Sequence, residues 1–219
     1  MLERELQWER ELFLFLNGSD SSFWDSFFYF YSFKWTWIPF YLCFIFVFIY
    51  RKTGTEIVND WKRIVWTIVS VIVVIVLCDQ IASGICKPLF HRFRPTHHPD
   101  FQDWVKTVFD QRGGKYGFIS SHAANTFGLA TWTVLLFRRR LFTFTMLLFA
   151  LLTGYSRIYL GLHFVSDVVA GALVGIVVGY VVYRLYRWKV KEVIYPTGWR
   201  IYLLCSAYII SVALLCIFS

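Results

Sequence analysis

The strongest constraint on this chain is a series of apolar runs that are long enough, or nearly long enough, to cross a lipid bilayer. A transmembrane helix needs about 20 apolar residues, because the hydrocarbon core is about 30 Å thick and leaves no backbone polar group unpaired. We expect six such helices, of which the third and fourth are short and borrow residues from their loops. They cover residues 35–50, 64–82, 123–137, 141–155, 168–186 and 201–218.

The composition is that of a membrane protein. Hydrophobic residues make up 58% of the 219-residue chain and charged residues only 16%, whereas soluble domains contain about 45–50% apolar and about 25% charged residues. The length suits one bundle, so we expect a single all-α integral membrane domain over residues 1–219. The five cysteines lie in or beside apolar runs without CxxC spacing, which indicates small buried hydrophobes.

Two features refine this bundle. In residues 5–16, apolar side chains recur between charges, which predicts an amphipathic helix on the membrane surface; disorder is the alternative. Because this segment has no continuous apolar core, we do not expect a cleavable signal peptide. In the span 168–186, Gly171, Gly175 and Gly179 form a stripe of small residues that predicts close packing against another helix.

Basic residues orient the spans. If six spans are correct, three basic connections fall on one face, and short basic loops mark the cytoplasm. These connections contain Arg51, Lys52, Lys62 and Arg63, then Arg138, Arg139 and Arg140, and finally Arg184, Arg187, Lys189 and Lys191. Both termini and the loops 86–117 and 160–167 then share the opposite face, which in a bacterium is periplasmic or extracellular. The same rule accounts for the net charge of +8, so we expect a bilayer and no nucleic acid as partner.

Ionisable residues gather on that outer face in three clusters. The stretch KPLFHRFRP places Lys87 seven residues before Arg94, and ISSHAAN places His122 just before a span. The stretch YSRIYLGLHFVSD contributes Arg157, His163 and Asp167. An Arg or Asp at membrane depth costs roughly 2.5–3.5 kcal/mol on insertion scales, so such groups normally have a partner or a task.

The three cations, and the pair formed by His163 and Asp167, suit phosphoryl transfer. Lys87, Arg94 and Arg157 together can cradle phosphate oxygens, since a guanidinium matches their geometry. If a helix begins by His163, the spacing of four lets Asp167 hold Nδ1–H and leaves Nε2 free to attack phosphorus.

The second cluster adds proton transfer and anion binding. His122 at the start of a span can protonate a leaving oxygen and then activate water. Backbone N–H groups of Ser120 and Ser121 at the same helix start favour an anion.

Each cluster also has a simpler interpretation. A histidine at a helix end is often a hydrated residue, and the cations also suit anionic lipid head groups. The spacing of His163 and Asp167 alone is equally consistent with a structural hydrogen bond. Only the combination on one face favours a catalytic site.

The three motifs resemble the signature of the type 2 phosphatidic acid phosphatase family, whose site is related to that of vanadium haloperoxidases. The patterns are Lys-x6-Arg-Pro, Ser-x-His and Ser-Arg-x5-His-x3-Asp. Here they are matched by Lys87, Arg94, Pro95, Ser120, His122, Ser156, Arg157, His163 and Asp167. The resemblance extends from about residue 79 to about residue 179.

This resemblance implies a six-helix membrane enzyme that hydrolyses lipid phosphates without a metal or other cofactor. It implies a phosphohistidine on His163, with Asp167 orienting that ring and His122 acting as acid and base. The implied phosphate-binding residues are Lys87, Arg94, Ser120, Ser121 and Arg157.

The chain departs from the family pattern in the second motif. The family usually has Pro-Ser-Gly-His, and this chain has Ile119-Ser120-Ser121-His122. Losing the glycine adds a Cβ where a backbone N–H approaches phosphate, although the Ser121 amide can still donate. Only two predicted spans precede the first motif, where the family commonly has three. The short chain and its outward N-terminus resemble the small bacterial branch that acts on polyprenyl diphosphates or lipid A phosphates.

A second histidine cluster follows the first motif. His97, His98 and Asp100 are expected to be hydrated loop residues, because HHPD lacks the regular spacing of most metal sites.

We therefore expect an integral-membrane phosphatase of the bacterial plasma membrane with its site on the outer face. Its expected substrate is undecaprenyl diphosphate or a lipid A phosphate, with phosphatidylglycerol phosphate or phosphatidic acid as the alternative. A transporter and an inactive lipid-phosphate-binding relative are the non-enzymatic alternatives. The ionisable residues cluster at one face rather than along the spans, which disfavours the transporter.

Overall fold

The computed structural model describes residues 2–49, 52–53, 56–57, 61–190 and 198–219. Within these ranges the chain forms the predicted all-α membrane bundle, apart from one hairpin of two-residue strands. Its first part contains α1 (Leu2–Leu16), α2 (Ser22–Tyr31), η1 (Lys34–Trp37), α3 (Ile38–Ile49), β1 (Lys52–Thr53), β2 (Glu56–Ile57), α4 (Trp61–Asp79), η2 (Gln80–Cys86) and α5 (Lys87–Phe90). Its second part contains η3 (Pro95–His97), η4 (Gln102–Trp104), η5 (Val108–Asp110), α6 (Ser121–Phe137), α7 (Arg140–Tyr159), α8 (Val165–Lys189) and α9 (Gly198–Phe218).

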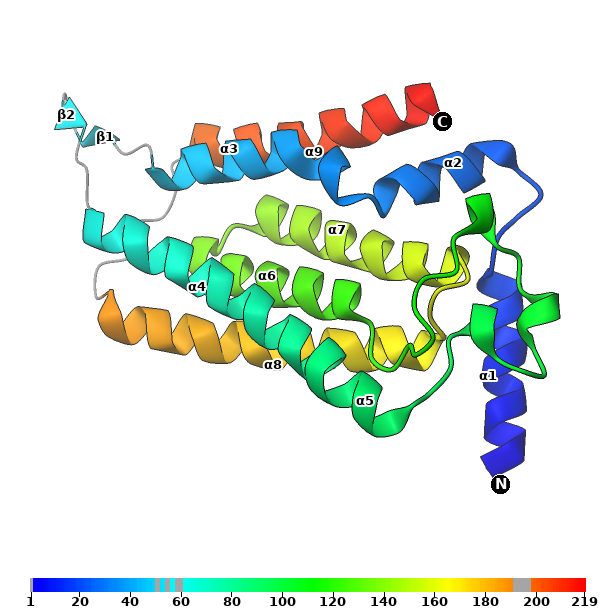
Figure 1. Ribbon diagram of the computed structural model, residues 1–219. Helices are drawn as coiled ribbons and strands as arrows, with labels where there is room; N and C mark the ends of the chain where they lie inside the picture. Colours follow the sequence, from blue (N-terminus) through cyan, green and yellow to red (C-terminus); the bar gives the residue numbers. More distant parts are fainter. Residues whose placement is uncertain (1, 50–51, 54–55, 58–60, 191–197) are drawn as a thin grey trace.

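Helix α6 occupies the middle of the bundle, where α4, α7 and α8 pack around it (Figure 1). Helices α3 and α9 pair with each other and lie over α7 as a second layer. Aromatic rings fill the space between these layers; the ring centroids of Trp37 and Phe149, for example, lie 4.8 Å apart. Since lipid tails are as apolar as the helices, such packing contacts rather than hydrophobicity hold the layers together.

The apolar helices confirm the membrane bundle but not the number of six spans. Among the described residues, four continuous helices are long and apolar enough to cross a membrane. A fifth is counted if α2 and the following helix, which meet at a bend of 67°, form one broken span. Helix α6 has 17 residues, which is shorter than the ~20 of a typical span.

The helices differ in their bounds from the predicted spans, and the first two spans also differ in shape. The span predicted over 35–50 is preceded by the bend and becomes helical as η1 and then α3, where Pro39 stands in the first turn, a position that needs no N–H donor. The span predicted to end at Ala82 continues through the π-helical turn η2 to Phe90. The outer loop therefore begins after Phe90 and not at Cys86, and Lys87 lies on the last helical turn.

The connections between the helices gather at two opposite ends of the bundle (Figure 1). The α6–α7 turn with Arg138 and Arg139, the start of α4 with Lys62 and the end of α8 with Lys189 lie together at one end. Both chain termini and the long loop between α5 and α6 lie at the other end. For the described residues this grouping agrees with the one predicted from the basic connections, of which Arg51 and Lys191 lie outside the described ranges.

Helix α1 is the predicted amphipathic helix and runs across the end of the bundle that holds the long loop (Figure 1). Phe13 on its inner face has no exposed surface, whereas Trp8 and Phe15 are 69% and 84% exposed. Such a distribution suits a helix that lies at the membrane interface.

The glycine stripe of α8 packs directly on α6, as predicted. A Cβ on Gly171 would lie 2.5 Å from the carbonyl oxygen of Ser120. A Cβ on Gly175 or Gly179 would press against the carbonyl oxygens of Ala124 and Gly128, respectively. The backbones of α6 and α8 therefore approach each other as only glycine allows.

This close approach predicts the effect of a single methyl group. Gly175→Ala should lower the free energy of unfolding by about 1–3 kcal/mol, because the new Cβ meets backbone that cannot move aside. The matched control is Gly198→Ala in α9, where a Cβ has its nearest neighbour, the Tyr202 ring, at 3.8 Å. Unfolding of both variants in detergent micelles measures the difference, and equal stabilities would contradict the close packing.

Candidate active site

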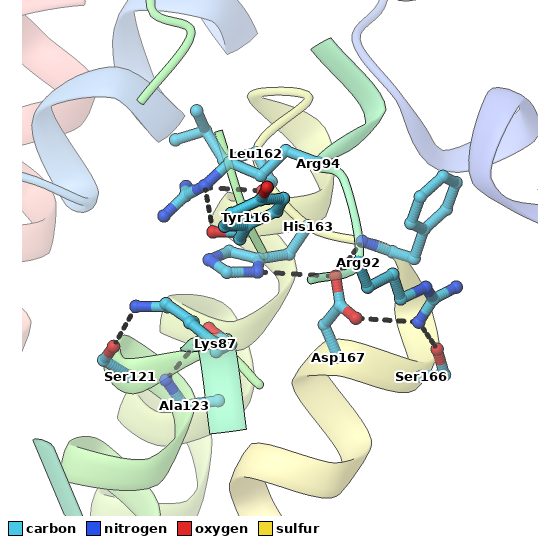
Figure 2. Close-up of polar contacts among 12 residues, drawn as sticks. Lys87, Arg92, Arg94, Tyr116, Ser121, Ala123, Leu162, His163, Ser166 and Asp167 are labelled. Carbon is cyan, nitrogen blue, oxygen red and sulfur yellow. Dashed lines mark hydrogen bonds and ion pairs between the residues drawn. The ribbon is translucent and has the colours of Figure 1, made fainter. Parts of the chain in front are cut away.

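The predicted site residues meet at the end of the bundle opposite the basic turns. Lys87 lies at the start of α5, Arg94 in the loop after it, His122 in the first turn of α6, and Arg157 in the last turn of α7. His163 lies in the connection between α7 and α8. Figure 2 shows Lys87 and Arg94 beside the imidazole of His163. The structure thus brings together three motifs that are separated by up to 76 residues in the chain, from Lys87 to His163.

The side chains of His163 and Asp167 lie side by side, but not in the way the spacing predicts. Helix α8 begins at Val165, so His163 lies before the helix and only Asp167 lies on it. The carboxylate Oδ2 accepts a hydrogen bond from the backbone N–H of Phe164 at 3.0 Å and lies 3.5 Å from His163 Nδ1. Such contacts often tighten when substrate binds. The capping of α8 by Asp167, rather than a shared helix face, brings the two side chains together.

His163 is only 1% exposed. Burial lowers the pKa of its imidazole well below the usual value, and the positive charges of Arg94, Arg157 and Lys87 lower it further. A neutral imidazole at physiological pH carries a lone pair that can attack phosphorus.

Each of the three cations is held by the protein itself. Lys87 Nζ donates to the hydroxyls of Ser83 and Ser121, both at 2.9 Å. The π-helical turn η2 just before Lys87 carries Ser83 to this position. Sequence patterns offered no signal for Ser83, because a serine inside an apolar helix is common.

The two arginines are anchored in different ways. Arg94 donates from Nε to the carbonyl of Tyr116 at 3.2 Å and from Nη1 to the carbonyl of Leu162 at 3.4 Å (Figure 2). Arg157 is 8% exposed and donates from Nη1 to Ser32 Oγ at 2.6 Å. Its Nε has no hydrogen-bond partner among the described residues. This donor suits an anion in the site.

The second motif caps α6, and the backbone N–H of Ser120 makes a different contact from the predicted one. The N–H of Ser120 donates to the carbonyl of Asp167 at 3.0 Å, and its Oγ accepts from Ala123 N–H. The backbone N–H of Ser120 therefore already has a partner. Phosphate binding by Ser120 stays a prediction, and it would use the hydroxyl. Ser121 starts the helix and receives Lys87 on its hydroxyl, and Ile119 is buried.

His122 lines a cavity of about 310 Å³ together with Arg157. The cavity extends from these two residues toward the bend between α2 and η1. Its other lining residues are Ser32, Phe33, Lys34, Gln111, Gly113 and Leu162. Space beside a histidine and an arginine suits a polar head group next to the phosphate.

The loop histidines have protein partners that the sequence did not predict. His98 Nε2 lies 3.2 Å from Nη2 of Arg10 in α1, and His97 Nδ1 lies 3.2 Å from Thr96 Oγ1. Within the described ranges, no group of three or more His, Cys, Asp or Glu side chains could hold a metal ion. Metal-independent chemistry stays a prediction.

Arg92 is a charged residue of the site that sequence reasoning missed. Its Nη1 donates to Asp167 Oδ1 at 2.8 Å and to Ser166 Oγ at 2.6 Å (Figure 2). From the stretch KPLFHRFRP, the sequence motif assigned roles to Lys87 and Arg94 but none to Arg92. The pattern of alternating arginines in HRFRP contained no indication of which carboxylate each would meet.

The two histidines should respond differently to substitution. His163→Ala should abolish turnover of nitrophenyl phosphate, because the attacking nitrogen is gone. His122→Ala should keep first-step activity on this substrate and lose activity on lipids, since nitrophenolate leaves without a proton. An alkaline detergent quench with labelled substrate should trap a base-stable, acid-labile phosphoenzyme in His122→Ala and none in His163→Ala. A label that persists without His163 would contradict these roles.

Comparison with known proteins places this arrangement in a family. The model of the PAP2 superfamily matches residues 63–191. The chain is 44% identical to a lipid A 4'-phosphatase of Porphyromonas gingivalis over 84% of this chain and 75% of that protein. It is 35% identical to a lipid A 4'-phosphatase of Bacteroides thetaiotaomicron over 76% of this chain and 72% of that protein.

A solved structure is similar as well. The crystal structure of Aquifex aeolicus LpxE superimposes with a TM-score of 0.55 at 27% identity. The match covers 80% of this chain and 93% of that one.

Proposed function

This chain belongs to the PAP2 superfamily and is a membrane lipid phosphatase, and we propose that it removes the 4'-phosphate of lipid A through a phosphohistidine on His163. The observation that supports lipid A as the substrate is the similarity to two lipid A 4'-phosphatases over three quarters or more of this chain. We assign the activity to a single domain over residues 1–219.

In the first step, the phosphate sits among Lys87, Arg94 and Arg157, which neutralise its charge as the transition state develops. Nε2 of His163 attacks phosphorus, and the bond from phosphorus to the sugar oxygen breaks. His122 gives its proton to that oxygen, so the sugar leaves as an alcohol.

In the second step, His122 takes a proton from water, and the resulting hydroxide attacks phosphorus. The bond from phosphorus to Nε2 breaks, inorganic phosphate leaves and His163 is neutral again. Asp167 holds the Nδ1–H side of the ring throughout and stabilises the positive charge that the phosphorylated imidazole carries, as a carboxylate does for histidine in serine proteases.

The cavity of about 310 Å³ supports a bulky polar head group. It reaches from His122 past Arg157 to Lys34 and Gln111, which are hydrogen-bonding side chains suited to a phosphorylated sugar. The apolar outer surfaces of the helices leave the acyl chains in the bilayer.

The substrate proposal is tested with purified protein in detergent, with EDTA present throughout. We expect phosphate release from bisphosphorylated lipid A, with the 4'-monodephosphorylated product identified by mass spectrometry. Undecaprenyl diphosphate, phosphatidylglycerol phosphate and phosphatidic acid serve as competing substrates. A higher kcat/KM on one of these lipids would contradict the proposal that lipid A is the substrate. Activity that requires an added divalent ion would contradict the metal-free mechanism.

We further propose that the site faces the periplasm from the inner membrane of a bacterium, because the basic turns at the other end favour the cytoplasm. With the native cysteines replaced, a cysteine at Gly114 should react with a membrane-impermeant thiol reagent in cells whose outer membrane has been permeabilised. A cysteine at Arg139 should react only after the inner membrane is also opened. The reverse pattern would overturn this orientation.

A further inference from the structure

Helix α1 is firmly attached beside the site. The ring of Phe13 packs edge-on against Phe101 and Phe164, with centroids 5.7 and 5.4 Å away. Just past the helix, Asn17 Nδ2 donates to the carbonyl of Tyr159 at 2.9 Å, and Asn17 Oδ1 accepts from Lys106 N–H at 2.8 Å. These contacts fix the side chains of α1 relative to the connection between α7 and α8.

Glu9 of α1 reaches the first turn of α8. Its Oε2 accepts from Arg92 Nη2 at 2.5 Å. Its Oε1 accepts from the backbone N–H of Ser166 at 3.2 Å and from the Ser166 hydroxyl. The nucleophile His163 lies only three residues before Ser166.

Arg92 connects Glu9 to Asp167. Its Nη1 donates to Asp167 Oδ1 while its Nη2 donates to Glu9 Oε2, and its guanidinium lies 4.7 Å from the centre of the Phe164 ring. The oxygens of Asp167 are thus divided. Oδ1 faces Arg92, and Oδ2 faces Phe164 N–H and His163 Nδ1.

The net charge of Glu9, Arg92 and Asp167 affects how strongly Asp167 attracts the imidazole of His163. One guanidinium is shared by two carboxylates, so the group of Glu9, Arg92 and Asp167 carries one net negative charge. Without Glu9, Arg92 would neutralise Asp167 alone and weaken its attraction for a positively charged imidazole. In a site of low dielectric, this difference in charge strongly changes the electrostatic stabilisation of the positively charged imidazole.

We propose that Glu9 is a positioning residue of the catalytic machinery, which acts through Arg92 on Asp167 and thereby supports phosphorylation of His163. This inference rests on the proposed phosphohistidine mechanism. Glu9 touches neither His163 nor substrate; it holds Arg92 and the first turn of α8 in place and leaves the charge of Asp167 available to the imidazole. It also makes the surface helix α1 a part of the active site.

The test compares Glu9→Gln with Glu11→Gln in the full-length protein. Glutamine keeps the size of the side chain and its hydrogen-bonding oxygen but removes the charge. Glu11 is a matched control on the same helix, because it is exposed and accepts a hydrogen bond only from Gln7 among the contacts described. Both variants are measured with nitrophenyl phosphate for the rate of phosphoenzyme formation, the KM and the inhibition constant of inorganic phosphate.

We expect Glu9→Gln to slow phosphoenzyme formation about tenfold, the size of effect seen when outer partners of a functional histidine are removed. The KM and the inhibition constant of phosphate should stay unchanged, because the cations of the cradle are intact. Glu11→Gln should match the wild type. Arg92→Lys should slow the same step further, since a single ammonium cannot span both carboxylates.

Two outcomes would overturn the inference. An unchanged rate in Glu9→Gln would mean that Glu9 only attaches α1. A rise in the phosphate inhibition constant as large as the fall in rate would mean that Glu9 supports binding rather than the reactivity of His163. If instead no phosphoenzyme forms in the wild type while phosphate is still released, the proposed mechanism fails and not this inference alone.

Discussion

A buried carboxylate at the start of α8 is the feature on which the rest of the site depends. The side chain of Asp167 has no exposed surface, and a buried charge without compensation costs several kcal/mol. Arg92, the N–H of Phe164 and the positive end of α8 all provide that compensation. Since the same carboxylate faces His163, the interactions that make the connection between α7 and α8 fold also position the ring of the proposed nucleophile.

The packing of α6 against α8 holds the second and third motifs in register. Glycines on α8 let the two backbones touch, and the N–H of Ser120 reaches the carbonyl of Asp167 at 3.0 Å. In this chain a serine occupies position 121, where the family usually has glycine. Its hydroxyl contacts Lys87 at 2.9 Å, so the added Cβ carries a group that holds one of the three cations of the candidate site.

Three cations around one histidine repel one another, and the protein holds each of them with neutral acceptors. Lys87 has two serine hydroxyls, Arg94 has two backbone carbonyls and Arg157 has Ser32 Oγ. Neutral acceptors satisfy the donors without cancelling their charge. The cluster is therefore preorganised for an anion, which is the arrangement that favours a phosphoryl-transfer transition state.

The amino-acid sequence by itself determined the class of the protein and predicted the residues of its candidate site. The apolar runs predict a helical membrane bundle because the bilayer leaves the backbone no other means to pair its polar groups. The motif spacings predicted Lys87, Arg94, Arg157, His122, His163 and Asp167 as site residues, since phosphate binding and transfer suit these residue types. The structure brings them to one end of the bundle, and their roles stay a prediction. The basic connections grouped the ends of the helices correctly, because their positions follow directly from the order of the spans.

Tertiary structure alone decided how these residues are held. The contacts of Arg92 with Glu9 and with Asp167 join residues 83 and 75 positions apart, and a charged residue in a sequence has many equivalent partners. Ser83 and Ser32 became part of the site only through the π-helical turn η2 and the bend after α2. The same holds for His163, which lies outside the helix because Asp167 caps α8. Local patterns select residue types, whereas long-range packing chooses which of them meet, because that choice depends on the energy of the whole bundle.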